Sequence, residues 1–193
     1  MSEQQDRVTA ILDAAYTCFT RHGVRRTTMD DIARAAGISR PAVYQHVRNK
    51  QDAFRRLAQR MLDAALATAE EAARTPGDLA ARLTAVLQAK LDLMRTVWRD
   101  SPAHAAELLG EDARLSGDLI ESWETALRTL LTDVAADTLP REEARELADL
   151  LLALTRGLEA DLSDPEAPCR RLRRGVALMV AGLDRTPSDQ EKP

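Results

Sequence analysis

Hydrophobic side chains recur at steps of three and four residues along most of the chain, which is the spacing of amphipathic helices. Gly23 follows the first stripe, and "TPGD", "DSP", "DTLP" and "SDPEAP" separate the later ones with residues that interrupt helices. The pattern predicts an all-α protein of about nine helices, one of them a short helix around residues 103–109. The last ten residues, "DRTPSDQEKP", are polar and predict a frayed tail.

Two short helices are predicted between residues 28 and 47. Thr28 is a suitable N-cap for the first, and Gly37 can adopt the positive φ that ends it. Ser39 caps the second, and Pro41 lies in its first turn, where a missing N–H costs nothing. A short helix, a tight turn and another helix therefore follow one another.

The spacing within this segment is typical of a helix-turn-helix. A small residue, Ala33, stands where a second helix must cross closely, and Val43 can pack back from that second helix. The outer face of the second helix then remains free to enter a DNA major groove. That face consists of Arg40, Ala42, Tyr44, Gln45 and His46. The same shape also occurs as structural filler, so the pattern alone leaves both interpretations open.

The charge is distributed unevenly. The whole chain has a formal net charge of −4, yet residues 1–50 hold 8 Lys and Arg against 5 Asp and Glu, which leaves 19 against 26 in the remainder. An anionic partner is therefore expected at the N-terminal fifty residues.

The composition predicts a cytoplasmic protein without cofactor or metal. Cys18 and Cys169 are too far apart to suggest a zinc site or a disulfide framework. The N-terminus lacks the apolar run of a signal peptide, and no apolar stretch is long enough to span a bilayer. Neither a Gly-rich phosphate loop, a G-x-S-x-G motif nor paired histidines at metal spacing occur, which argues against an enzyme.

Residues 8–56 resemble a known family. In "ILDAAYTCFTRHGVRRTTMDDIARAAGISRPAVYQHVRNKQDAF" the elements I-L-x-A-A, F-x-x-x-G, T-T-x-x-x-I-A-x-x-A-G-I-S and Y-x-H-V-x-x-K stand in one order. This string resembles the N-terminal domain of the TetR/AcrR family of bacterial helix-turn-helix transcriptional regulators. Val47 departs from the phenylalanine that is frequent there.

The resemblance implies DNA contacts at individual positions. Thr28 and Lys50 would contact phosphates, and Tyr44 and His46 would lie on the backbone that flanks the groove. Arginine can bind guanine, glutamine can pair with adenine, and alanine or proline can meet a thymine methyl group. The residues that would face bases are Arg40, Pro41, Ala42 and Gln45.

The resemblance further implies a domain arrangement of a helix-turn-helix domain at residues 1–50, a helical effector-binding and dimerisation domain at 51–185, and a flexible tail at 186–193. Family members pair through their last two long helices as a four-helix bundle. The residues predicted to form that face are Leu150, Leu151, Leu154, Leu158, Val176, Met179, Val180 and Leu183. They could instead belong to the core. However, the leucines of residues 147–158 form an apolar surface that is wider than one core-facing stripe requires.

A small-molecule pocket is the second feature that the resemblance implies. Methionine and aromatic side chains suit an adaptable apolar cavity. The candidates are Leu91, Met94, Trp98, His104, Leu108, Trp123 and Leu127. Such residues at helical spacing are more often core, which is the alternative for each of them.

The sequence thus predicts a ligand-responsive regulator, most simply a repressor, that binds operator DNA as a homodimer and leaves it when a small molecule binds. The alternative is a helical protein-binding scaffold or co-regulator without a small-molecule effector.

Overall fold

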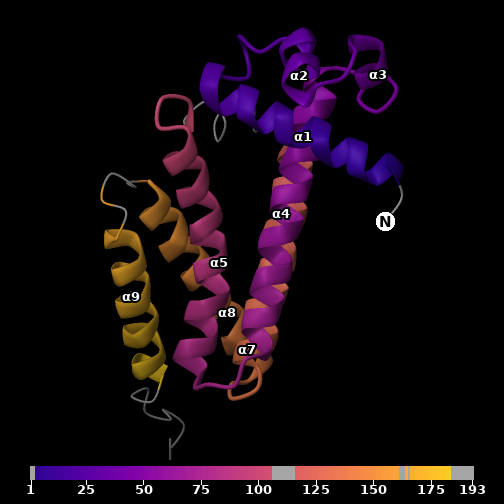
Figure 1. Cartoon of the computed structure of the whole chain (residues 1–193). Coiled ribbons are helices and arrows are strands. Elements are labelled where there is room, and N and C mark those ends of the chain that lie inside the picture. The colour runs from indigo at the N-terminus through magenta and orange to yellow at the C-terminus, as the bar shows by residue number, and fades with distance from the viewer. Residues whose placement is uncertain (1–2, 106–115, 161–163, 165, 184–193) are drawn as a thin grey trace, which may run out of the picture. The chain divides into compact units, whose positions relative to one another are not determined.

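The computed structural model describes residues 3–105, 116–160, 164 and 166–183, and every regular element in them is a helix (Figure 1). The all-α prediction is therefore confirmed. The eight helices of the described residues are α1 (Glu3–His22), α2 (Met29–Ala36), α3 (Arg40–Tyr44), α4 (Lys50–Arg74), α5 (Leu79–Asp100), α7 (Gly117–Ala135), α8 (Arg141–Glu159) and α9 (Ala167–Leu183). Most of the short helix predicted around residues 103–109, and the tail predicted at 186–193, lie outside the described residues.

The chain divides into two compact units. The first consists of residues 1–64 and 95–123, and the second of residues 65–94 and 124–193. Because α4, α5 and α7 each contribute to both units, neither unit is a continuous stretch of sequence. The predicted division into residues 1–50 and 51–185 stays a prediction, but the compact part that holds the N-terminal helices includes later segments as well.

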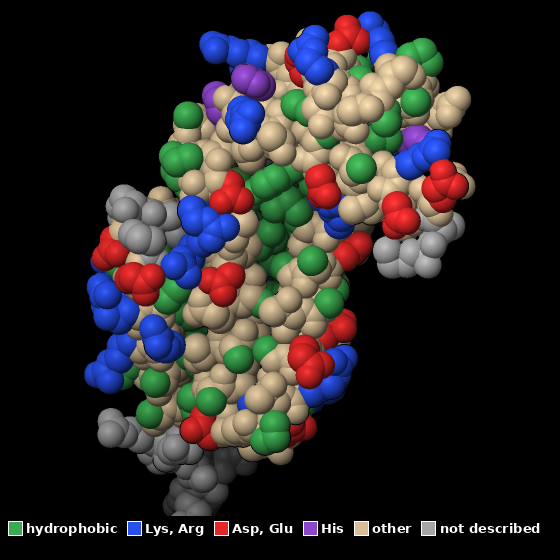
Figure 2. All heavy atoms as spheres, viewed as in Figure 1, with side chains coloured by type: hydrophobic (Ala, Val, Ile, Leu, Met, Phe, Trp, Pro, Cys, Tyr) green, Lys and Arg blue, Asp and Glu red, His purple; other side chains and the backbone are tan. Residues whose placement is uncertain are grey.

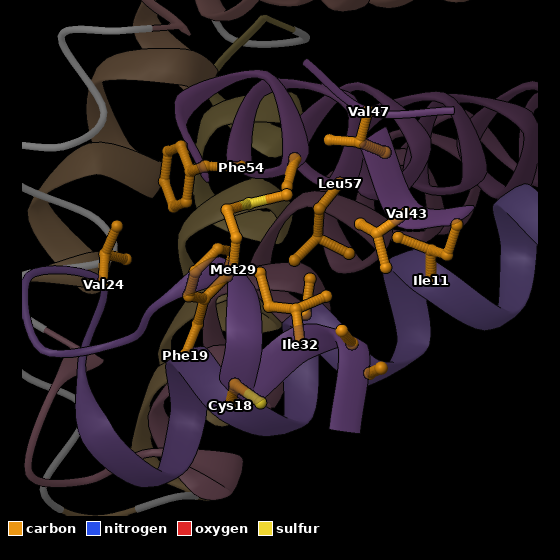
Figure 3. Close-up of a cluster of buried hydrophobic side chains, with 14 residues drawn as sticks. Ile11, Cys18, Phe19, Val24, Met29, Ile32, Val43, Val47, Phe54 and Leu57 are labelled. Atoms are coloured by element: carbon orange, nitrogen blue, oxygen red, sulfur yellow. The ribbon is translucent and has the colours of Figure 1, made fainter. Parts of the chain in front are cut away.

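The hydrophobic stripes of the N-terminal helices build the core of the first unit (Figure 3). Phe19 from α1 and Ile32 from α2 are fully buried, and Val43 from α3 is buried with them. The Phe19 and Phe54 rings meet edge to face with their centroids 5.9 Å apart. This core therefore fixes α2 and α3 against α1 and against the first turns of α4.

Polar contacts attach α1 and α4 to later segments within the first unit. The Tyr16 hydroxyl donates to the Asp100 carboxylate at 2.6 Å, and Arg60 donates to Asp13 at 2.7 Å. Burial and this hydrogen bond raise the pKa of Tyr16, while the bond lowers the pKa of Asp100. Arg55 binds Asp118 with both terminal nitrogens, which lowers the pKa of Asp118 to about 2.

In the second unit, α9 packs closely against α8. A Cβ atom added at Gly175 would come within 2.6 Å of the Leu154 side chain, so the glycine permits the approach. Across the same unit, the Lys90 ammonium group donates to Glu159 at 2.6 Å with only 4% of the lysine side chain exposed. Burial raises the pKa of Glu159. The Lys90–Glu159 ion pair is therefore largely buried in the second unit.

Both cysteines, Cys18 and Cys169, are free and buried. Among the described residues, no helix has the length and apolar character that crossing a membrane requires.

Candidate nucleic-acid interface

The N-terminus of α2 carries a complete capping box centred on Thr28. The Thr28 hydroxyl accepts a hydrogen bond from the Asp31 amide at 3.2 Å and donates one to the Asp31 carboxylate at 2.6 Å. That carboxylate also accepts the Thr28 amide at 3.0 Å. The hydroxyl of Thr28 is the main cause of the lowered pKa of Asp31. The predicted N-cap is confirmed, and the capping box fixes the first turn of α2. The amide groups of a first turn have no acceptor inside their own helix.

Gly37 makes the turn between α2 and α3 with φ at +69°, as its place in the sequence predicts. Its amide donates to Arg34, and the following amide, of Ile38, donates to the Ala33 carbonyl at 3.1 Å. These bonds satisfy the last carbonyls of α2. The turn therefore sets the angle at which α3 leaves.

Helix α3 starts as predicted and is short. The Ser39 side chain accepts from the Ala42 amide at 3.3 Å, and Pro41 lies in the first turn. The helix ends at Tyr44, so Gln45 is its C-cap, and the predicted contacts Gln45 and His46 lie just beyond the last helical residue.

The two faces of this segment differ sharply in exposure. Val43 and Val47 are fully buried, which places both valines inward as the sequence indicates. The residues on the opposite side are exposed or half-buried: Arg40, Pro41, Ala42, Tyr44, Gln45 and His46. The buried valines thus anchor one side of the segment. The other side presents a polar surface made of residue types that can read base edges.

Arg40 and Tyr44 form a small cluster on that surface. The Arg40 guanidinium lies 5.5 Å from the centroid of the Tyr44 ring and donates to its hydroxyl at 3.4 Å. It also pairs with Asp30 at 3.2 Å. The Tyr44 hydroxyl and then Asp30 raise the pKa of Arg40. The cluster holds a cation at the start of α3, where a DNA base or phosphate could replace the exposed carboxylate of Asp30.

Lys50 has a role that the sequence did not indicate. Its ammonium group donates to the Arg25 carbonyl at 3.0 Å, so it fastens the loop before α2 to the start of α4. An ammonium group has three donors, so this bond leaves capacity for a phosphate. Exposed arginines stand on the same stretches at positions 25, 26 and 48, and the predicted site omitted them.

The residues predicted to line a ligand pocket are divided between the two compact units. Leu91, Met94 and Leu127 belong to the second unit, whereas Trp98, His104 and Trp123 belong to the first. Leu91 and Leu127 have no exposed surface, which fits the alternative that they are core. Leu108 lies outside the described residues.

A groove of about 700 Å³ within the second unit is lined by other residues. They come from α5, from α9 and from the residues just before each of these helices: Asp78, Ala80, Ala81, Thr84, Ala85, Gln88, Glu166, Cys169 and Arg173. None of the predicted pocket residues is among them.

The predicted dimer surface is partly buried and partly exposed. Leu151 and Val176 are fully buried, and so belong to the chain's own interior rather than to a surface that a partner could reach. Leu150 is 54% exposed, and Leu178, which the prediction omitted, is 56% exposed. The half-buried members are Leu154, Leu158, Met179, Val180 and Leu183. Exposed leucines on α8 and α9 therefore remain available to a partner.

Comparison with known proteins agrees with this geometry. The model of "Bacterial regulatory proteins, tetR family" matches residues 11–57, the segment that forms α1 to α3 and the start of α4. Residues 11–57 thus form an N-terminal domain of the tetR family. Among the described residues, no group of three or more His, Cys, Asp or Glu side chains could hold a metal ion.

Relatives extend the likeness beyond the helix-turn-helix. The transcriptional activator FasR of Mycolicibacterium smegmatis is 27% identical over 143 residues, which are 74% of this chain and 63% of FasR. A transcriptional regulator from Rhodococcus sp. Rha1 has the same fold, with a TM-score of 0.70, 23% identity and coverage of 94% of this chain and 97% of that one. The SmeT–triclosan complex gives a TM-score of 0.66 at 21% identity, covering 98% and 99%. The fold of these solved structures thus covers nearly the whole chain.

Proposed function

We propose that this tetR-family chain is a transcriptional regulator that binds operator DNA through residues 28–50 and acts as a homodimer. The observation that carries the proposal is the two-sided segment at α3, with Val43 and Val47 fully buried and Arg40, Tyr44 and Gln45 exposed. The excess of basic over acidic residues in positions 1–50 supports an anionic partner there.

In this proposal the exposed side chains divide into two classes. Arg40 and Gln45 read base edges, as Pro41 and Ala42 do through apolar contact. Thr28, Tyr44, His46 and Lys50 contact the phosphate backbone and set the register. The amide groups in the first turn of α2 point out of the helix end and suit a phosphate near Thr28.

The homodimer rests on the exposed leucines of α8 and α9. Leu150 and Leu178 are each more than half exposed. A partner that covered both side chains would remove apolar surface from water, which favours association. With two chains on one duplex, the half-sites would lie about 34–36 Å apart or a multiple of that.

In this proposal a small molecule controls the binding of DNA. One solved structure of this fold is a SmeT–triclosan complex, which supports a small-molecule ligand for this chain. The ligand could release the DNA only through a difference in its affinity for the bound and free states of the protein. Repression is the simplest outcome, although the relative FasR carries the name of an activator.

The test uses a duplex that the chain itself selects from a random-sequence pool, and fluorescence anisotropy. Arg40→Ala or Gln45→Ala should reduce the preference for the selected over a scrambled duplex by about 1–3 kcal/mol each. Lys50→Ala should weaken binding to both duplexes alike and lower the salt dependence. At saturation, sedimentation should find two chains per duplex.

Arg7→Ala is the matched control, because Arg7 is exposed and pairs with Glu3 one turn away on α1. This variant should bind both duplexes like the wild type. If no duplex is selected at all, the DNA proposal fails and the protein-binding scaffold becomes the better interpretation.

A further inference from the structure

A second cationic feature lies in the first unit, apart from the outer face of α3. It is a hollow of about 260 Å³ lined by Arg21, His22, Arg26, Asp31 and His104. Figure 2 shows histidine side chains next to Lys and Arg side chains at the corner where α1 ends in Figure 1. Its volume is below the range usual for pockets that enclose a drug-sized molecule, so it suits a small group.

The lining comes from segments that are far apart in sequence but fixed together. The Ser101 hydroxyl donates to the Thr20 carbonyl at 2.9 Å, which binds the turn after α5 to the end of α1. The His104 amide donates to the Ser101 carbonyl at 3.1 Å, so the backbone of His104 is held in that turn. These bonds bring His104 to the hollow that Arg21 and His22 also line.

The charges in the hollow favour an anion. Two guanidinium groups face one carboxylate, and that carboxylate, of Asp31, already accepts from the Thr28 amide, the Thr28 hydroxyl and Arg34. Within the part of the chain that the structure describes, the side chains of Arg21, His22 and Arg26 form no ion pair with a carboxylate. Guanidinium groups bind phosphate oxygens with paired hydrogen bonds, and each imidazole can donate at least one more.

We propose that this hollow binds one phosphate group, with Arg21 and Arg26 as the main contacts and His22 and His104 as further donors. Asp31 belongs both to the hollow and to the cap at Thr28, so the site adjoins the predicted phosphate contact at α2. The phosphate can come from the DNA backbone, in which case the inference rests on the proposed function, or from a free phosphate-bearing molecule.

The first arm of the test uses inorganic phosphate and the full chain. Phosphate should shift the amide NMR signals of residues 21–26 and 104 along a saturable curve. The double variant Arg21→Ala, Arg26→Ala should weaken that binding about tenfold or more. His104→Gln should keep partial binding, because an amide group can still donate.

The control removes two positive charges elsewhere. Arg7 and Arg74 are exposed and pair with glutamates of their own helices, so Arg7→Ala, Arg74→Ala changes the net charge equally. This variant should show the wild-type phosphate titration. Equal circular dichroism of both double variants would show that neither has lost its fold.

The second arm uses an arbitrary 20-base-pair duplex and measures log K against log salt. If DNA supplies the phosphate, the Arg21 and Arg26 variant should lose about 0.9 from the slope for each chain bound, and the control variant should lose nothing. A positive phosphate titration with an unchanged slope would instead identify a free phosphate-bearing ligand.

The inference is overturned if neither the phosphate titration nor the salt slope differs between the two double variants. Its failure is separable from that of the proposed function. If the chain binds phosphate but selects no duplex, the phosphate site stands and the proposed operator binding fails. If the chain binds a selected duplex but both arms of the phosphate test are negative, the operator binding stands and the phosphate site fails.

Discussion

Alanine in place of Phe19 is expected to lower the free energy of unfolding of the first unit by about 3–5 kcal/mol. Phe19 is fully buried, and its ring meets Phe54 of α4 edge to face. The substitution would leave a cavity between α1, which carries the ring, and the helices that α1 supports. Urea denaturation followed by circular dichroism measures the loss.

The control for this prediction is Phe19→Leu, which keeps most of the apolar volume and should cost clearly less. DNA binding should fall in parallel with stability, because α2 and α3 are positioned by the same core. If the alanine variant were as stable as the leucine variant, the ring would not be central to that core.

Removal of Lys90 is expected to have the other large effect. Lys90→Ala leaves the carboxylate of Glu159 without its cation inside the second unit, and breaking a buried pair in this way costs about 3–5 kcal/mol. The cost should be greatest at high pH, where Glu159 must be charged, and should shrink as the pH falls and the carboxyl takes up a proton. Thermal denaturation at a series of pH values, on both sides of the titration of this carboxyl, measures the change.

Two comparisons sharpen the Lys90 prediction. The double variant Lys90→Met, Glu159→Leu removes both charges and should recover most of the stability. Arg74→Ala breaks an exposed pair and should change stability by about 0–1 kcal/mol. A loss at Lys90 as small as that at Arg74 would show that the buried pair does not stabilise the second unit.

The local features of the helix-turn-helix were predictable from sequence because they depend on neighbouring residues. The cap at Thr28, the positive φ of Gly37 and the Ser39 cap each involve side chains and amides within four positions. The inward valines, Val43 and Val47, follow from helical spacing alone. Such short-range chemistry is readable before any tertiary contact is known.

The long-range contacts were not predictable in this way. Tyr16 and Asp100 are 84 residues apart, and Lys90 and Glu159 are 69 apart, so no spacing in the sequence joins them. Their pairing depends on how the helices pack, which periodicity does not specify. The role of Lys50 at the Arg25 carbonyl was missed for the same reason.

For the candidate pocket, the sequence pattern could not separate cavity-lining residues from core residues. An apolar residue at helical spacing faces inward whether it lines a cavity or fills the core, so the pattern could not distinguish the two for Leu91 or Leu127. Both are fully buried. Similarly, the leucine-rich α8 indicated an apolar surface but did not separate the exposed Leu150 from the buried Leu151.

The structure offers one more basic surface that could compete for DNA. Helix α9 carries four exposed arginines, at positions 170, 171, 173 and 174, in the second unit. Phosphate attraction alone does not distinguish this surface from residues 28–50. The difference lies in the side chains around α3 that can read bases.

Hydrogen–deuterium exchange of the full chain, with and without the selected duplex, tests the central claim most directly. The duplex should slow amide exchange at residues 26–50 and leave exchange at residues 170–174 unchanged, and a scrambled duplex should protect residues 26–50 less. Protection confined to α9, or the absence of any protection at residues 26–50, would contradict the assignment of this surface to DNA.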